Sequence, residues 1–345
     1  MNLAPISIVS IGMMTGLGLT STESCAALRA RSDNFRETGF ISRGEEWVIG
    51  SEVPLDEPWR GIPRLARLAA GPLRECLGSV DDLKVEEVPV LLCVAEPERP
   101  GRLAGLGDDL LREVSTLVGA RLNHGSRLFS DGRVGAALAL RHGGALIREH
   151  GVRYVAVCGV DSLLASATLA AYIERGRLLT TQSSNGFIPG EAGAALLLTS
   201  SANAPEPCLS CHGIGVAREP APIESGEAFR ADGLTEAFRQ ALGDAGVSLA
   251  EIGYRIADMS GEQYWFRQAD LASSRLLRGR HEFQDIWHPA DGIGEVGAAM
   301  LPCMLGVAFM AARKGYAPGD PVLAHAANDD GRCTALVLSA GRAAG

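Results

Sequence analysis

The stretch that decides the fold is NGFIPGEAGAALLLTS, residues 185–200. Its Asn-Gly and Pro-Gly pairs predict a tight loop, and the apolar run that follows predicts a buried strand. A similar strand, TALVLSA, occupies residues 334–340. Two helices built mostly from small and apolar residues, at 132–150 and 294–315, repeat in the same way. This repetition predicts an α/β unit that occurs twice.

The segment SANAPEP, residues 201–207, is rich in small residues and proline and predicts a linker between the two units. We therefore expect an N-terminal half, residues 1–203, and a C-terminal half, residues 204–345, with the apolar helices packed between two sheets. The remaining expected elements are strands at 6–12, 87–97, 153–162, 208–217 and 255–261 and helices at 21–30, 59–76, 106–118, 166–179, 227–247 and 269–279.

The overall composition excludes several classes of function. Apolar residues make up 46% of the 345 residues, enough for a core without disulfides or metals. The net charge of -9 argues against nucleic-acid binding, which needs a basic surface. No apolar run approaches the roughly 18 residues of a membrane span, and the first residues lack the basic segment of a signal peptide. Eight cysteines without regular spacing predict reduced thiols, so we expect a cytoplasmic protein that does not bind membranes.

Two short motifs match cofactor patterns by coincidence. CLSCH, residues 208–212, matches the haem-attachment pattern, but the segment is predicted as a strand and has no second cysteine pair for zinc. GIGEVG, residues 292–297, matches a dinucleotide fingerprint, but the preceding DIWHPAD is predicted as a loop instead of the required strand. We therefore expect neither a cofactor nor a metal.

The segments GVDS (159–162) and NGFIPGEAGAALLL (185–198) together resemble the β-ketoacyl synthases of the thiolase-like superfamily. SIGMMTGLG (10–18) resembles the first strand and turn of that family, and GEVGAA (294–299) resembles its late glycine-rich motif. The resemblance extends over most of the chain and implies a five-layered α-β-α-β-α fold of two duplicated halves. It also implies an acyl carrier protein as partner and a dimer, with itself or with a ketosynthase-like chain, whose interface lies near the strand at 90–96.

The family's chemistry needs a cysteine at the N-terminus of the first buried helix, where the helix dipole lowers the pKa of the thiol. Counting back from GVDS places that position within Gly132–Val134, with Arg133 at its centre. None of these residues is a nucleophile. The nearest cysteines, Cys93 and Cys158, lie in predicted strands and are expected to be core residues.

The family's second half supplies two histidines, or a histidine and an asparagine, that stabilise the oxyanion. The first position falls on Ser260 or Met259, and the second falls on Glu295. The lysine that precedes it in many members falls near Ala290, and HAANDDGR, residues 325–332, replaces the late glycine-rich loop. A carboxylate in an oxyanion site repels the charge it should stabilise, unless it is protonated. The sequence thus predicts a degenerate ketosynthase that acts as a non-catalytic partner or adaptor, as chain length factors do.

The role of Arg133 has several possible explanations. A buried arginine requires a partner, which would be Glu295 across the two halves or the neighbouring Asp131. Arg133 could also bind an anion at the helix N-terminus. A tunnel filled by Arg133, Phe187 or Glu295 would favour the non-catalytic interpretation.

The alternative function is an active acyltransferase or condensing enzyme that uses Ser130 as its nucleophile on carrier or coenzyme A thioesters. His288 or His325 would then serve as the base, oriented by Asp131 or Asp291. An open tunnel with a nucleophile in reach of a base would favour this alternative.

Three arginines lie one turn apart on the predicted helix at 59–76: Arg60, Arg64 and Arg67. In the resembling family, a basic helix at this place often meets the acidic carrier protein, so these residues are candidates for carrier docking. The other explanation is a solvated basic face, which is common on amphipathic helices.

Overall fold

In the part of the chain that the structure describes, ten strands form one hydrogen-bonded sheet, in the order β10-β9-β11-β12-β8-β1-β7-β6-β4-β5. This computed structural model describes residues 5–42, 44–278 and 284–341. The strands that precede residue 204 lie on one side of the β1–β8 pairing, and the later strands lie on the other. The strands are β1 (Ile6–Thr15), β4 (Val90–Cys93), β5 (Arg127–Phe129), β6 (Val155–Ser162), β7 (Glu191–Ser200), β8 (Leu209–Arg218), β9 (Tyr254–Ala257), β10 (Asp285–Trp287), β11 (Val322–Ala327) and β12 (Arg332–Ala340), while β2 (Arg36–Ile41) pairs with β3 (Trp47–Gly50).

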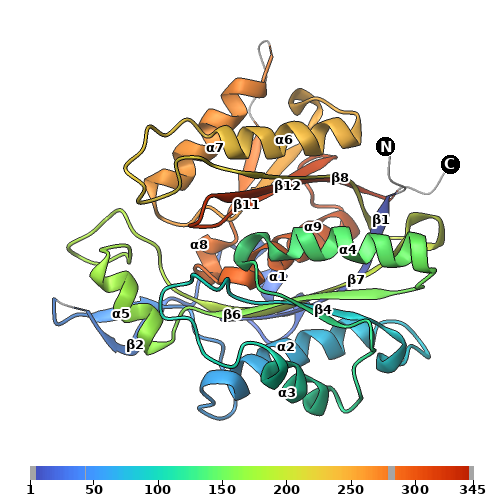
Figure 1. The fold of residues 1–345 in the computed structure, drawn as a ribbon, viewed down its shortest axis with the longest axis horizontal. Coiled ribbons are helices and arrows are strands. Elements are labelled where there is room, and N and C mark those ends of the chain that lie inside the picture. The colour runs from blue at the N-terminus through green and yellow to red at the C-terminus, as the bar shows by residue number, and fades with distance from the viewer. Residues whose placement is uncertain (1–4, 43, 279–283, 342–345) are drawn as a thin grey trace.

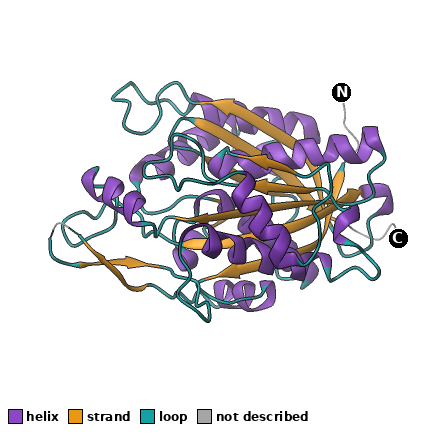
Figure 2. Cartoon of the chain, turned by 60° about the horizontal axis from the view of Figure 1, so that its bottom comes forward, coloured by secondary structure: helices purple, strands orange, loops and turns teal. Residues whose placement is uncertain are grey.

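The helices cover both faces of each half-sheet (Figures 1 and 2). Helices α4 and α9 lie between the two half-sheets, α2 and α3 cover the outside of the first, and α6 and α7 cover the outside of the second. The result is the expected five-layered arrangement. The helices are α1 (Ser21–Arg29), α2 (Gly61–Leu77), α3 (Asp108–Val118), α4 (Gly135–His150), α5 (Ser166–Glu174), α6 (Asp232–Ala245), α7 (Gln263–Leu276), α8 (Ala290–Ile293) and α9 (Met300–Arg313).

The apolar run that decides the fold is β7, which is buried on both faces. Because side chains alternate along a strand, Leu196 and Leu198 join the core around α9, whereas Leu197 joins the core under α2 and α3. The buried carboxylate of Glu191 at the start of β7 accepts a 2.9 Å hydrogen bond from the Ser162 hydroxyl at the end of β6. The two segments that carry the family resemblance therefore meet in the structure.

The two central helices begin alike. A 3-10 turn, Gly132–Val134, leads into α4, and the turn Gly297–Ala299 leads into α9. The first glycine of each turn has a positive φ, 58° at Gly132 and 52° at Gly297. A Cβ atom would lie 2.2 Å from Glu96 Oε2 in the first turn and 2.0 Å from Asp161 Oδ2 in the second. Only glycine fits both turns, which supports the predicted duplication.

The structure corrects several predicted elements. DIWHPAD is not wholly a loop, because residues 285–287 form β10. The sequence also left β2, β3, β5 and β11 unassigned. The strand β5 is a short edge strand, and β2 and β3 form a separate pair. The strand β11 is buried on both faces, so its sequence shows no alternation of polar and apolar residues. The helix expected at 227–247 is confined to α6, and the one expected at 269–279 begins earlier, as α7; residue 279 lies outside the described residues.

None of the helices in the described part of the chain is long and apolar enough to cross a membrane.

Candidate functional site

The side chain of Arg133, in the turn before α4, is buried between the two halves of the molecule. Its Nη1 atom lies 3.3 Å from Glu295 Oε2, and its Nη2 atom lies 2.6 Å from Asp329 Oδ1. The ion pair between Arg133 and Glu295 is therefore confirmed, and Asp329 is a further partner. Asp131 pairs with Arg332 instead.

Glu295 occupies the place that the resemblance gave to a histidine. Its carboxylate accepts hydrogen bonds from the Ser260 hydroxyl at 3.0 Å and from the Gly297 amide at 2.9 Å. Burial raises the pKa of Glu295, and the nearby Arg133 offsets only part of this effect. Ser260 and Glu295, both expected at the degenerate site, thus lie together beside Arg133.

A second arginine, Arg177, lies on the same cavity and was not anticipated from the sequence. It makes two hydrogen bonds to Glu262, at 2.7 and 2.8 Å, and one to Asp329 Oδ2 at 2.6 Å. The Tyr172 hydroxyl donates to Asp329 at 3.2 Å. Burial alone would raise the pKa of Asp329, but Arg133 and Arg177 lower it well below its usual range. Asp329 therefore stays ionised and bridges the two arginines.

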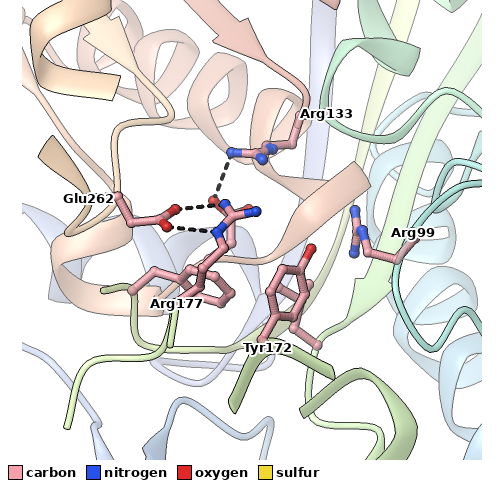
Figure 3. Close-up of a pocket in the computed structure, with 8 residues that line it drawn as sticks. Arg99, Arg133, Tyr172, Arg177 and Glu262 are labelled. Carbon is pink, nitrogen blue, oxygen red and sulfur yellow. Dashed lines mark hydrogen bonds and ion pairs between the residues drawn. The ribbon is translucent and has the colours of Figure 1, made fainter. Parts of the chain in front are cut away.

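A third arginine, Arg99, approaches from the other side (Figure 3). It makes two hydrogen bonds of 2.9 Å to Glu96, and its Nη1 atom lies 3.2 Å from Asp161 Oδ2. All three arginines thus have acidic partners. We call the group formed by Arg99, Arg133, Arg177, Glu262, Glu295 and Asp329 the buried ionic cluster.

The space that these side chains leave is about 10 Å³, which is enough for a single water molecule. Arg133, Phe187 and Glu295, the three residues expected to fill a collapsed tunnel, all line it. The thioester arm of an acyl carrier is far larger than this space. In the conformation described, the cavity at the start of α4 is closed to such a substrate.

Among the described residues, neither the thiols of Cys93 and Cys158 nor the Ser130 hydroxyl is hydrogen-bonded to a histidine. Cys93 and Cys158 are buried core residues, as expected, and burial raises the pKa of both thiols. The His325 ring packs against Phe238, and the Nε2 atoms of His325 and His288 have no hydrogen-bond partner among the described residues. Neither Nε2 atom is therefore hydrogen-bonded to Ser130.

The structure corrects the expectation for the basic helix. Arg64 is buried, and its guanidinium bonds to Glu191, with Nε at 3.0 and 2.9 Å from the two carboxylate oxygens. It fixes α2 to β7 and is not presented to a carrier protein. Arg60 is exposed at the start of α2, and the guanidinium of the half-buried Arg67 lies 3.3 Å from the centre of the Trp59 ring.

Sequence reasoning missed Arg99, Arg177, Glu262 and Asp329. The acidic pair in HAANDDGR, at the place of the family's late glycine-rich loop, was the available signal for Asp329. The others come from separate loops, and no local pattern marks them. Across residues 5–42, 44–278 and 284–341, no group of three histidine, cysteine or acidic side chains is placed to hold a metal ion.

Solved structures of ketosynthases have the same fold. The ishigamide ketosynthase/chain length factor matches with a TM-score of 0.80 and 17% identity, over 98% of this chain and 100% of that chain. The ketosynthase ApeO in complex with its chain length factor ApeC, from Xenorhabdus doucetiae, matches with a TM-score of 0.78 and 17% identity over 98% of each chain. A β-ketoacyl synthase from Burkholderia phymatum STM815 matches with a TM-score of 0.75 and 14% identity, over 98% of this chain and 100% of that chain.

No protein-family profile and no curated protein sequence matches this chain. At identities of 13–17%, the structural likeness establishes the fold. The chain has the thiolase-like ketosynthase fold that the sequence predicted.

Proposed function

We propose that this chain, which has the ketosynthase fold, is a non-catalytic partner of a ketosynthase-like chain. The observation that carries the proposal is the closed cavity at the start of α4, where Arg133 is paired with Glu295 and Asp329. A cysteine thiolate would be stabilised at this helix N-terminus, whereas a guanidinium cannot take up an acyl group.

The electrostatics of the cavity also oppose acyl transfer. Stabilising an oxyanion requires donors that are free to face the developing charge. Here the donors of Arg133 and Arg177 are engaged by carboxylates. The sequence resemblance assigns Glu295 to the position of a donor, where its carboxylate would repel an oxyanion. The space is therefore organised to hold the protein's own ion pairs.

Several observations support a ketosynthase-like partner. Structures with the same fold are described as a ketosynthase/chain length factor and as a ketosynthase in complex with its chain length factor. Another is described as an acyl-carrier protein in complex with its ketosynthase. In the described part of the chain, β5 forms an edge of the sheet, next to β4, and an edge strand can pair with another chain. We place the assembly in the cytoplasm, in fatty acid or polyketide synthesis; the buried free thiols fit a reducing compartment.

The test of the non-catalytic role is intact-mass analysis after incubation with acyl-coenzyme A and acyl-carrier thioesters. We expect no covalent adduct on this protein, while an active ketosynthase is acylated under the same conditions. A stable acyl adduct that disappears in Ser130→Ala would overturn the proposal and establish the acyltransferase alternative.

The partner role is tested by mixing the protein with the ketosynthase encoded nearest to it and measuring mass by light scattering. We expect a mixed complex of defined stoichiometry that forms in preference to either chain's self-association. Separate elution of both chains at micromolar concentration would contradict the partner role without affecting the first test.

Carrier docking on α2 is a separate part of the proposal. Because Arg64 is buried, the candidate docking surface consists of Arg60 and Arg67. The double variant Arg60→Ala, Arg67→Ala should weaken binding of acyl carrier protein to the complex, most clearly at low salt. Arg121→Ala, at another exposed arginine, is the matched control. Equal carrier affinity in both variants would exclude this surface.

A further inference from the structure

A second cavity, of about 640 Å³, lies where the end of α1, β10, α8 and the end of α9 meet. It shares no lining residue with the closed cavity at the start of α4. Its volume falls in the range of roughly 300–1,000 Å³ that is usual for pockets that bind small molecules. The proposed partner role does not use it.

One wall of this cavity is a stack of aromatic side chains. The rings of Trp287 and Tyr316 lie 6.3 Å apart at 26°, and Trp287 also packs on the buried Tyr254 at 4.9 Å. The Arg29 guanidinium lies 4.2 Å from the centre of the Tyr316 ring. Trp287 therefore contacts the core through Tyr254, and the exposed Arg29 lies beside Tyr316.

Another part of the cavity lining is apolar. Leu28 and Cys25 from α1 and Val307 from α9 line it. Burial raises the pKa of Cys25 to about 12, so this thiol stays neutral and behaves as a small apolar group. A Cβ atom on Gly292 would lie 2.9 Å from Leu28 Cδ2, so the glycine lets α8 pack closely against α1.

The charge around the cavity is mainly positive and unpaired. Arg29 and Arg31 line it, and neither has an acidic partner among the described residues. The acidic residue on the lining, Asp291, is exposed and lies 3.9 Å from His288 Nδ1. Burial lowers the pKa of His288, so this ring is neutral near pH 7. Two guanidiniums are thus available for a ligand.

We propose that this cavity binds a small organic carboxylate whose apolar body lies against Trp287 and Tyr316. Arg29 and Arg31 would hold the carboxylate, because guanidinium and carboxylate form strong paired hydrogen bonds. The apolar wall of Leu28 and Val307 would take the body of the ligand from water. A simple inorganic anion would leave both walls of the cavity without a partner.

Binding is measured on the full-length protein by titration calorimetry and ligand-detected NMR. The probes are octanoate and 1-naphthoate, with octan-1-ol, 1-naphthalenemethanol and inorganic phosphate as comparisons. We expect saturable binding at one site for at least one carboxylate, tighter than for its alcohol and for phosphate. If neither carboxylate binds at millimolar concentration, or if the matching alcohol binds equally well, the proposal is wrong.

Two variants locate the site. Arg29→Gln with Arg31→Gln should weaken carboxylate binding about tenfold and leave alcohol binding unchanged, because only the charged contacts are lost. Leu28→Trp should narrow the cavity and weaken binding of both the carboxylate and the alcohol. Arg121→Gln is the matched exposed control and should bind as the wild type does. Since the two rim arginines are exposed, unchanged carboxylate affinity in their folded double variant would overturn the proposal even if Leu28→Trp were unstable.

Discussion

Arg133 is a cation at the N-terminal end of a buried helix, where both the helix dipole and the loss of water disfavour positive charge. Burial alone would lower the pKa of Arg133, but Glu295, Asp329 and Asp258 raise it above its ordinary value. The ring of Trp265 adds a cation–π contact, with its centre 4.7 Å from the guanidinium carbon. The charge is therefore permanent, and the carboxylates are what make its position stable.

The first prediction concerns the pair Arg133 and Glu295. Arg133→Met should lower the free energy of unfolding by about 3–5 kcal/mol, because it leaves buried carboxylates without their cation. Glu295→Gln should cost less, since its one amide oxygen still accepts from either Ser260 or Gly297, which donate to different oxygens of the Glu295 carboxylate. The two losses should fall short of additivity by about 1 kcal/mol or more in urea unfolding.

The exposed pair Arg112 and Asp109 provides the control for this cycle. Its coupling energy should stay below about 0.5 kcal/mol, because exposed pairs are screened by water. Additive losses at Arg133 and Glu295, as at the control pair, would mean that their ion pair contributes no coupling.

The second prediction concerns pH. Burial raises the pKa of Asp258 from 3.8 to about 7, with Arg133 opposing and Glu295 adding to the shift. Between these values the folded protein binds a proton that the unfolded chain has released, so this group's contribution to stability falls as pH rises. Asp258→Asn removes the effect while keeping an acceptor for the Ala327 amide.

The stability of Asp258→Asn relative to wild type should therefore increase from pH 5 to pH 8, by at most about 1.4 kcal/mol per pH unit. Urea unfolding at several pH values measures this difference, with the exposed Asp109→Asn as the control. A difference that does not change with pH would show that Asp258 is ionised in the folded protein throughout.

At the scale of elements, the two glycine turns set the starts of α4 and α9. Gly132 and Gly297 have left-handed backbones, and each has a carboxylate where a Cβ would lie. These contacts bring Glu96 and Asp161 to the helix N-termini, where negative charge is favourable. Arg99 pairs with both carboxylates and so links the starts of the two helices.

The third prediction compares two glycines with positive φ. Gly151, at the end of α4, has a φ of 67°, and no atom lies within 4 Å of the position that an alanine Cβ would take. Gly151→Ala should therefore cost only about 1 kcal/mol for the backbone. Gly132→Ala has the same backbone cost and also displaces Glu96, so it should cost at least about 1 kcal/mol more. Thermal and urea unfolding measure both, and equal losses would contradict the steric argument.

At the scale of the whole molecule, β1 and β8 join the two half-sheets, and in the described part of the chain they pair through residues 6–8 and 209–211. The buried ionic cluster is a second connection, on the other side of the central helices. Arg133 and Arg177 come from the first half, and both contact Asp329 from the second. The cluster therefore fastens the halves together across the closed cavity at the start of α4.

The fourth prediction tests this connection. Asp329→Asn should lower the melting temperature, because it removes the negative charge that Arg133 and Arg177 share. Hydrogen exchange should become faster in both halves, at residues 132–136 and at residues 258–263, because both segments contact the cluster. Arg112→Met should change neither segment. Faster exchange in the second half alone would show that the cluster does not couple the halves.

The sequence by itself determined the repeated α/β plan, the glycine-rich turns and the absence of a cysteine at the start of α4. These features depend on local patterns, such as apolar runs for β6 and β7 and small residues for α4. It also offered Glu295 as one possible partner of Arg133, beside Asp131 and a bound anion, because a buried arginine needs an acid.

Only the tertiary structure decided what surrounds that pair. Arg177 and Glu262 are 85 residues apart, and Arg133 and Asp329 are 196 apart, so no local pattern links them. The same holds for Arg64, which periodicity placed with its exposed neighbours on α2 but which reaches Glu191, 127 residues away. Periodicity reports which face of a helix is apolar, whereas the partner of a long charged side chain depends on how distant segments pack.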